Sequence, residues 1–238
     1  FSDHISDQSV QRYDTFINTG VTGIQRAGVA APTFGGVGGV IEIAGNDTDE
    51  DQFVMSTHGP AFVVSDTVAN SRKLWFEARF SKASIGNDAL AFFLGLAFDH
   101  GAGVTVAKTL CLTNTNANLG AFSYLGFHVD QAAGATLDAV YKAESQSQTV
   151  NAAGIQTMVA NTYYRLGLMY DPDAPAAKRI KWFVDGVEQS TYVTATQIAA
   201  ATFPDAEPLA MVLCTKTGET AAVASQMDWW RCAQLRGA

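Results

Sequence analysis

Acidic side chains at alternate positions of a strand are the first groups to test for chemistry. A glycoside hydrolase needs two carboxyl groups flanking the scissile bond, about 5–5.5 Å apart for retention or about 6.5–9.5 Å for inversion. On one strand this arrangement would read Glu-x-Asp-x-Glu, because alternate side chains share a face. No such triplet occurs: Glu77 shares its face with Arg79, and Asp228 stands alone. Asp171 and Asp173 flank a proline in a turn. We therefore predict no catalytic residues and no enzymatic activity.

Histidines and oxygen ligands are the next candidates. The four histidines lie in separate turns or strands, and no Gly-x-Ser-x-Gly elbow accompanies them, so we expect each to form structural hydrogen bonds. The histidines are His4, His58, His100 and His128. The run Asn46-Asp47-Thr48-Asp49-Glu50-Asp51 offers hard oxygen ligands that suit Ca²⁺, but it lacks the glycine and spacing of an EF-hand and is expected to be a solvated turn. Residues 35–39 lack the Gly-x-Gly-x-x-Gly spacing of a phosphate cradle. We predict no metal and no cofactor.

The three cysteines, Cys111, Cys214 and Cys232, are an odd number at wide spacing. None forms a Cys-x-x-Cys pair or lies near a histidine at ligand spacing. We expect buried free thiols, since free cysteine commonly behaves as a small apolar residue. This reading fits assembly in a reducing cytoplasm.

Charge and hydropathy limit the partners. The 238 residues carry a net charge of −8, and their 15 Lys and Arg residues are scattered along the sequence, so nucleic acid is not an expected partner. The longest apolar runs, such as Ala89 to Phe98, fall well short of the ~20 residues that a membrane span requires, so we expect a soluble protein without a membrane partner. Phe1 is not a start methionine, and we expect the chain to be processed or trimmed.

Period-two alternation is the main structural signal. From Lys73 to Phe80, Leu74 and every second residue after it are apolar, which predicts a half-buried strand. Residues Ala91 to Phe98 are apolar at every position, as expected of a central strand covered on both faces. Further strands are expected at Val40 to Ile43, Ala121 to Asp130, Leu137 to Ala143, Tyr163 to Tyr170, Arg179 to Val184, Val187 to Tyr192, Pro208 to Thr215 and Met227 to Leu235.

The turn Asp185-Gly186 between two β-rich runs predicts a type I′ hairpin, because both residues tolerate positive φ. Only Ala195 to Ala201 suits a short helix. Ten or more strands without alternating helices predict an all-β fold, a sandwich or a barrel, and not a βαβ fold. We expect residues 35–238 to form this single domain and residues 1–34 to be an N-terminal arm or an edge strand.

The four tryptophans, Trp75, Trp182, Trp229 and Trp230, could stack on sugar rings. Trp229 and Trp230 are adjacent and must point to opposite faces of a strand, so at most one of them lies between the sheets. We expect a loop, a partner subunit or a sugar to cover the other, and favour a loop or partner.

Seven segments carry a resemblance to a known family. They are Lys73 to Phe80 (KLWFEARF), Phe93 to Ala97, Gly126 to Val129, Leu137 to Lys142, Tyr164 to Leu168, Ile180 to Gly186 and Met227 to Gln234 (MDWWRCAQ). Together they resemble tailed-phage virion proteins of concanavalin A/LamG-like fold, which implies a two-sheet antiparallel jelly-roll sandwich. The resemblance implies a non-enzymatic capsid decoration (cement) protein that binds the major capsid protein or another virion protein, as a homo-oligomer on the particle. It would then be a virion protein assembled in a bacterial host cytoplasm. The alternative is a carbohydrate-binding module or receptor-binding adhesin of a phage fibre or tail, with a glycan as partner.

Overall fold

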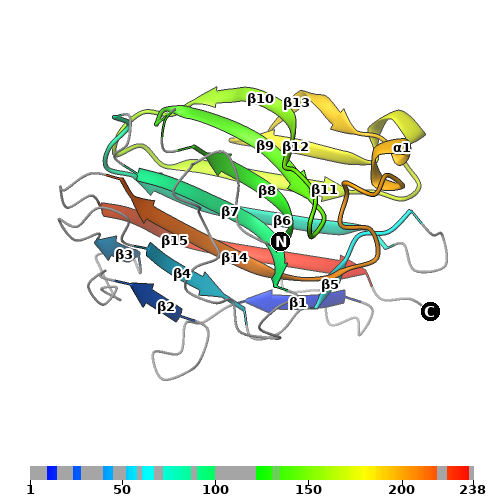
Figure 1. Ribbon diagram of the computed structural model, residues 1–238, viewed down its shortest axis with the longest axis horizontal. Coiled ribbons are helices and arrows are strands. Elements are labelled where there is room, and N and C mark those ends of the chain that lie inside the picture. Colours follow the sequence, from blue (N-terminus) through cyan, green and yellow to red (C-terminus); the bar gives the residue numbers. More distant parts are fainter. Residues whose placement is uncertain are drawn as a thin grey trace.

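The computed structural model describes residues 10–14, 24–27, 40–44, 52–57, 61–66, 72–86, 90–99, 122–130, 132, 134–218 and 224–235. In these residues the chain forms two layers of antiparallel strands (Figure 1). Sheet A consists of β1 (Val10–Asp14), β3 (Ile41–Ala44), β6 (Leu74–Lys82), β11 (Tyr164–Tyr170), β12 (Ile180–Val184), β13 (Val187–Val193) and β15 (Ala224–Leu235). Sheet B consists of β2 (Ile24–Ala27), β4 (Gln52–Ser56), β5 (Phe62–Val63), β7 (Leu90–Asp99), β8 (Phe122–Val129), β9 (Thr136–Lys142), β10 (Thr149–Thr157) and β14 (Pro208–Thr217).

The strand order confirms the predicted two-sheet antiparallel sandwich. Sheet A runs β1-β15-β6-β11-β12-β13, with β3 also paired to β15. Sheet B runs β10-β9-β8-β7-β14-β4-β2, with β5 also paired to β14. The helices include η2 (Ala176–Lys178) and α1 (Ala195–Ile198), and among the described residues no helix is long and apolar enough to cross a membrane.

The main core lies between the two sheets. On β6 the predicted alternation is observed, because Leu74, Phe76, Ala78 and Phe80 are buried there while the residues between them are half-buried on the outer face. Trp182 of β12 is fully buried against the ring of Phe127, at 5.4 Å between ring centroids, and its indole N–H donates to the side-chain oxygen of Asn151 at 2.8 Å. An indole buried with its N–H satisfied stabilises the fold through both its area and its hydrogen bond.

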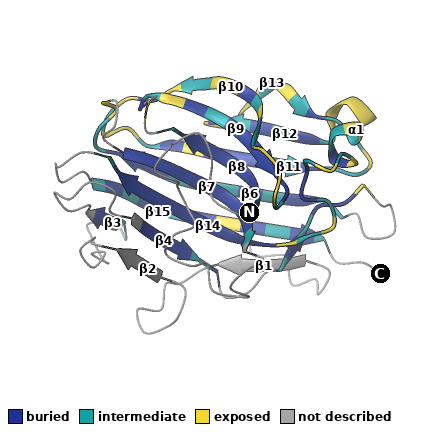
Figure 2. Ribbon diagram, viewed as in Figure 1, coloured by how far each residue is buried: buried dark blue, intermediate teal, exposed yellow. Residues whose placement is uncertain are grey.

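The central strands of sheet B, β7, β8 and β14, are buried on both faces. The outer face of this sheet carries a second apolar cluster, formed by Val54, Ala91, Phe93, Ala97, Phe122, Tyr124, Val140, Val212 and Cys214. Every residue of β8 is buried, and β7, β8 and β14 are dark blue along most of their length in Figure 2. This confirms the prediction that residues 91–98 belong to a strand covered on both sides.

Two facing glycines allow this second cluster to pack. Gly95 of β7 and Gly126 of β8 are directly opposite each other in the strand pairing. A Cβ atom on Gly126 would lie 2.6 Å from the carbonyl oxygen of Leu94 and 3.0 Å from the ring of Phe93. The ring of Phe93 therefore occupies the space that side chains at these two positions would fill.

The predicted hairpin is confirmed between β12 and β13. Asp185 has φ 50° and Gly186 has φ 81°, the two positive values that a type I′ turn requires. The turn is attached to β11 as well, since the backbone N–H of Asp185 donates to the carbonyl of Arg165 and its carboxylate accepts from the Arg165 N–H, both at 2.8 Å.

Replacing Gly186 by valine is expected to destabilise the protein by more than ~1 kcal/mol, because a β-branched residue resists positive φ. The matched control is Gly186→Asn, which adds a side chain that tolerates this conformation. Urea unfolding of the two variants measures the difference. Equal stabilities for the valine and asparagine variants would contradict the assigned turn.

Several elements differ from the sequence expectations. The helix is confirmed but shorter, with Thr194 and Gln197 forming a capping box at its start. Strands β2, β4, β5 and β10 were not expected from the sequence, and β1 is an edge strand paired with β15.

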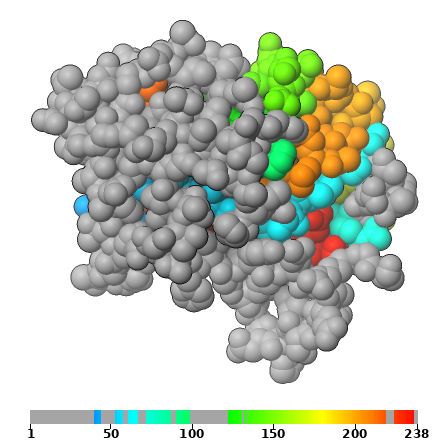
Figure 3. Space-filling model, turned by 60° about the horizontal axis from the view of Figure 1, so that its bottom comes forward, coloured from blue at the N-terminus to red at the C-terminus, as the bar shows by residue number. Residues whose placement is uncertain are grey.

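At one end of the sandwich, segments distant in sequence meet (Figure 3). The side-chain oxygen of Gln234 accepts a hydrogen bond from the Val63 N–H at 3.0 Å, and this bond fixes β5 to the end of β15.

Candidate functional site

The outer face of sheet A carries arginine and aromatic side chains side by side. Strand pairing places Trp229 beside Arg79, and Arg79 beside Arg165, in one row across β15, β6 and β11. The next row contains Arg231 and Glu77. We call this surface the arginine face, and it comprises Trp75, Glu77, Arg79, Arg165, Met169, Lys181, Phe183, Trp229 and Arg231.

Two carboxylates hold the three arginines in place. One oxygen of Glu77 pairs with Nε of Arg165 at 3.1 Å, and its other oxygen accepts from Nε of Arg231 at 3.1 Å. Asp228 pairs with Arg79. A register shift between Met227 and Trp229 sets Asp228 in this position, so the aspartate that seemed isolated in the sequence is ion-paired.

Aromatic rings support two of these guanidinium groups. Arg79 lies 4.2 Å from the ring centroid of Tyr163, and Arg231 lies 4.9 Å from that of Trp229. The Tyr163 hydroxyl donates to the side-chain oxygen of Gln226 at 2.7 Å, which fixes its ring. The arginines are therefore oriented before any partner binds.

The other sequence candidates do not form a catalytic arrangement in the described residues. Asp171 and Asp173 both pair with Lys73, at 3.2 and 3.7 Å. Glu77 and Asp228 have oxygens occupied by arginines, which suits charge neutralisation and not proton donation. In the described part of the chain no group of three His, Cys, Asp or Glu side chains could hold a metal ion.

The tryptophan pair has the predicted opposite orientations. Trp230 is buried in the core between the sheets, whereas Trp229 is half-buried on the arginine face. Trp75 shares the outer face with Trp229, and Trp182 belongs to the core. Two of the four tryptophans are thus available for contact with a partner.

His128 is a buried side chain on the outer face of sheet B. It lies directly across from Phe93 and Asp138 on the neighbouring strands. Its Nε2 atom has no hydrogen-bond partner, and burial lowers the pKa of the imidazole to about 4. His4, His58 and His100 lie outside the described residues, as do the glycine-rich run 35–39 and the acidic residues 46–51.

Lys82 is buried inside the sandwich. Its ammonium donates to the carbonyl oxygens of Leu90 and Gly134, both at 2.6 Å. The two acceptors belong to sheet B and its β8–β9 connection, so this side chain of β6 links the two sheets. Burial lowers the pKa of Lys82 to about 7. The predicted strand ended at Phe80, so neither the buried position of this lysine nor its carbonyl partners were predicted.

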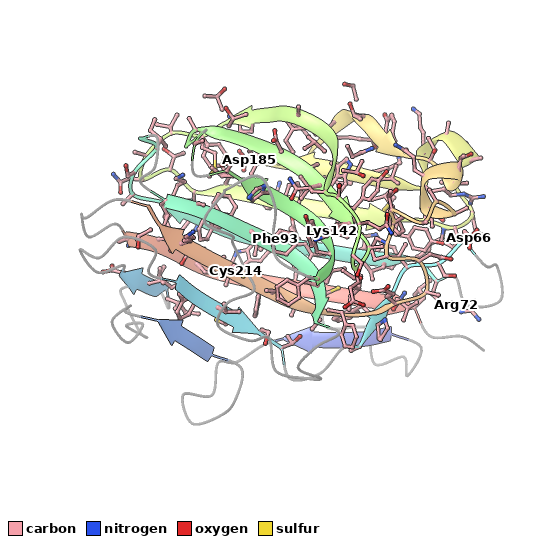
Figure 4. The ribbon with its side chains drawn as sticks, viewed as in Figure 1. Asp66, Arg72, Phe93, Lys142, Asp185 and Cys214 are labelled. Atoms are coloured by element: carbon pink, nitrogen blue, oxygen red, sulfur yellow. The ribbon has the colours of Figure 1, made fainter. Side chains whose placement is uncertain are left out.

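The cysteine prediction is partly wrong. Cys232 is free and buried in the core, and burial raises the pKa of its thiol. Cys214, however, is disulfide-bonded. It lies on the outer face of sheet B beside Phe93 (Figure 4). Sequence spacing did not indicate this bond, because the fold and not the spacing decides which sulfurs meet. Cys111 lies outside the described residues.

Reduction of the disulfide at Cys214 is expected to lower the free energy of unfolding by about 2–4 kcal/mol. Thermal unfolding with and without a phosphine reductant measures this change. Peptide mapping of the non-reduced, alkylated protein should find Cys232 modified after denaturation and the Cys214 peptide linked. Alkylation of Cys214 without reduction would contradict the assignment, and Cys232→Ser is the control that should leave the linkage intact.

Known proteins resemble this chain in structure and not in sequence. No protein-family model and no curated protein matches it. Peanut lectin, solved with a nine-residue peptide, has a TM-score of 0.60 at 12% identity, over 94% of this chain and 96% of the lectin. The endo-1,3-β-glucanase of Streptomyces sioyaensis has a TM-score of 0.57 at 14% identity, over 99% of this chain and 100% of the enzyme. A protein of unknown function from Shewanella oneidensis MR-1 has a TM-score of 0.54 at 14% identity, over 95% of this chain and 86% of that one.

These similarities define the fold class. The chain is a concanavalin A-like, lectin-like jelly-roll β-sandwich. At such low identity the likeness concerns the fold alone, because one fold hosts many unrelated functions.

Proposed function

We propose that this chain is a non-enzymatic structural protein of a phage particle, a decoration protein that binds the major capsid protein through the arginine face. One observation carries the proposal. The two segments that most resemble phage virion proteins, residues 73–80 and 227–234, are neighbouring strands in the structure. Together they supply Trp75, Glu77, Arg79, Trp229 and Arg231 to one outward surface.

The difference between the two sheets supports the choice of this surface. The apolar cluster on the outer face of sheet B is buried, so these residues offer little area to a partner. The arginine face combines half-buried aromatic side chains with fixed arginines, a composition enriched at the centres of protein interfaces. Contacts of this kind on several capsomers would stabilise a shell, with the chain bound as a homo-oligomer.

The disulfide at Cys214 is compatible with this role. Disulfides persist in oxidising surroundings, which include the surfaces of virions. A protein assembled on the particle in the bacterial cytoplasm meets such surroundings after release. We therefore keep the virion as its proposed location.

The proposal is tested by quantitative mass spectrometry of particles purified from a host that carries the gene. We expect the protein in a fixed copy-number ratio to the major capsid protein. Absence from the particles would overturn the proposal, and a few copies per particle would favour a fibre or tail position.

The expectation that the protein is not an enzyme can be tested separately. The purified protein is expected to release no reducing sugar from laminarin, cellulose or uronate polysaccharides, because its described carboxylates on the arginine face are ion-paired. Turnover that Glu77→Gln or Asp228→Asn abolishes would show an enzyme instead.

Carbohydrate binding is the second candidate function, and one observation favours it. Trp75 and Trp229 are both half-buried on the same outer face, where an indole can stack on a sugar ring. A glycan array of the parent protein and the Trp75→Ala variant separates the two functions. Reproducible binding to a sugar, lost in the variant, would favour an adhesin or carbohydrate-binding module.

A further inference from the structure

Four separate parts of the chain meet around Lys82 at one end of the sandwich. We call them the end cap, and they are residues 83–86, 134–135, 158–161 and 224–225. Backbone hydrogen bonds of 2.7–2.9 Å join them, from the N–H of Ala83 to Ala224, of Met158 to Ala135, and of Asn161 to Lys82. The end cap is thus assembled from segments that are distant in sequence.

The end cap has a poorly buried outer side. Ile85 and Val159 are among the exposed large apolar side chains, at 36% and 55% exposure. A Cβ atom on Gly134 would lie 2.1 Å from the carbonyl oxygen of Gly86, so these two connections touch through their backbones. Parts of a protein with few buried apolar contacts open at low free energy. We therefore expect the end cap to open more readily than the core.

The side chain of Lys82 links the end cap to both sheets. Its nitrogen donates to the carbonyls of Leu90 and Gly134, both at 2.6 Å. Ser225 lies directly across from Lys82 on β15, and its buried hydroxyl oxygen has no hydrogen-bond partner, so it does not accept from the lysine. Two acceptors match the two N–H groups of a neutral amine, whereas an ammonium has three donors. Within the described residues the site therefore satisfies the neutral amine better than the ammonium.

The surroundings of Lys82 also favour the neutral amine. Burial is the cause that lowers the pKa of Lys82 to about 7, and no charged group of the described residues contributes. The titratable group that β11 presents on this side of the core is Tyr164, whose hydroxyl accepts from the Val159 N–H at 3.0 Å. The neighbouring residue of β15 is Ser225, which does not titrate in this range.

We propose that Lys82 is a pH-sensitive switch, which holds the end cap closed as a neutral amine and lets the cap open locally when it binds a proton. In the open cap water solvates the amine, whose pKa then returns to its ordinary value of 10.5. Between pH 7 and that value the open cap binds a proton that the closed cap does not, so a lower pH favours opening. This switch does not depend on the proposed function.

The experiment is amide hydrogen exchange of the full chain at pH 7, 8 and 9, followed by NMR and corrected for the intrinsic effect of pH on exchange. The opening constants of the Ala83, Met158 and Asn161 amides should be about fifty-fold smaller at pH 9 than at pH 7. The internal controls are the Asp171 and Leu235 amides, which donate to Arg179 and Lys73 at the opposite end of the sandwich. Their opening constants should not change.

Two variants assign the effect to one side chain. Lys82→Met keeps an unbranched side chain that cannot bind a proton, and its end cap should open to the same extent at every pH. The matched control Lys178→Met removes an exposed lysine outside the end cap and should keep the fifty-fold change of the parent.

Three results would overturn the proposal. They are opening constants of the end cap that do not change with pH in the parent, a pH effect that persists in Lys82→Met, and an equal effect at both ends of the sandwich. End-cap amides that exchange only with the free energy and urea dependence of global unfolding would also exclude a local switch. If Lys82→Met does not fold, the comparison of the two ends in the parent decides alone.

Discussion

Replacing Gly126 by alanine should cost about 3 kcal/mol or more of folding free energy, whereas replacing Gly167 by alanine should change it by less than about 0.5 kcal/mol. A Cβ on Gly126 would meet backbone atoms of β7 at 2.6 and 2.8 Å, which cannot move without distorting the sheet. A Cβ on Gly167 would meet its neighbours at 3.4–3.7 Å, which is ordinary van der Waals contact or close to it.

The two glycines form a matched pair, because both lie inside strands and both receive the same single methyl group. Urea unfolding followed by tryptophan fluorescence gives the free energies. Similar losses for the two variants would show that the close approach of β7 and β8 is not a constraint on stability.

The stability of the protein should rise as the pH increases from 7 to 9, by an amount that Lys82 governs. Burial lowers the pKa of Lys82 from 10.5 to about 7. Between these values the unfolded chain binds a proton that the native state does not, so the free energy of unfolding increases with pH. The full shift corresponds to about 5 kcal/mol, of which roughly half falls between pH 7 and 9 and the remainder between pH 9 and about 10.5.

The variant Lys82→Met isolates this contribution. It removes the titrating group but keeps an unbranched apolar side chain in the core, so its stability should vary much less over the same pH range. Guanidinium unfolding of both proteins at several pH values measures the two slopes. Parallel slopes would show that Lys82 is not buried with a lowered pKa.

Local signals in the sequence were sufficient for most strands and for the hairpin. The alternation from Leu74 to Phe80 and the Asp185-Gly186 turn depend on near neighbours, so each could be predicted from a few residues. Strand β10 could not be predicted in this way. Two register shifts and a positive φ at Gly154 interrupt its pairing with β9, and they obscure any period of two.

The candidate site depends on contacts that the sequence does not reveal. Arg79, Arg165 and Arg231 are scattered along the chain, and only the strand order β15-β6-β11 brings them together. The bond at Cys214 and the carbonyl partners of Lys82 have the same origin. Alternation predicted the outward face of Arg79, while its neighbours on that face followed from topology.

The double burial of strands β7, β8 and β14 separates a protected centre of sheet B from the accessible outer face of sheet A. Amide protons of β8, whose residues are all buried, are expected to exchange with solvent only when the whole domain opens. Strands β12 and β13, at the accessible edge of sheet A, can open locally at a much lower free energy. We therefore expect a partner that docks on the arginine face to slow amide hydrogen exchange in sheet A. Exchange in the central strands of sheet B should stay unchanged.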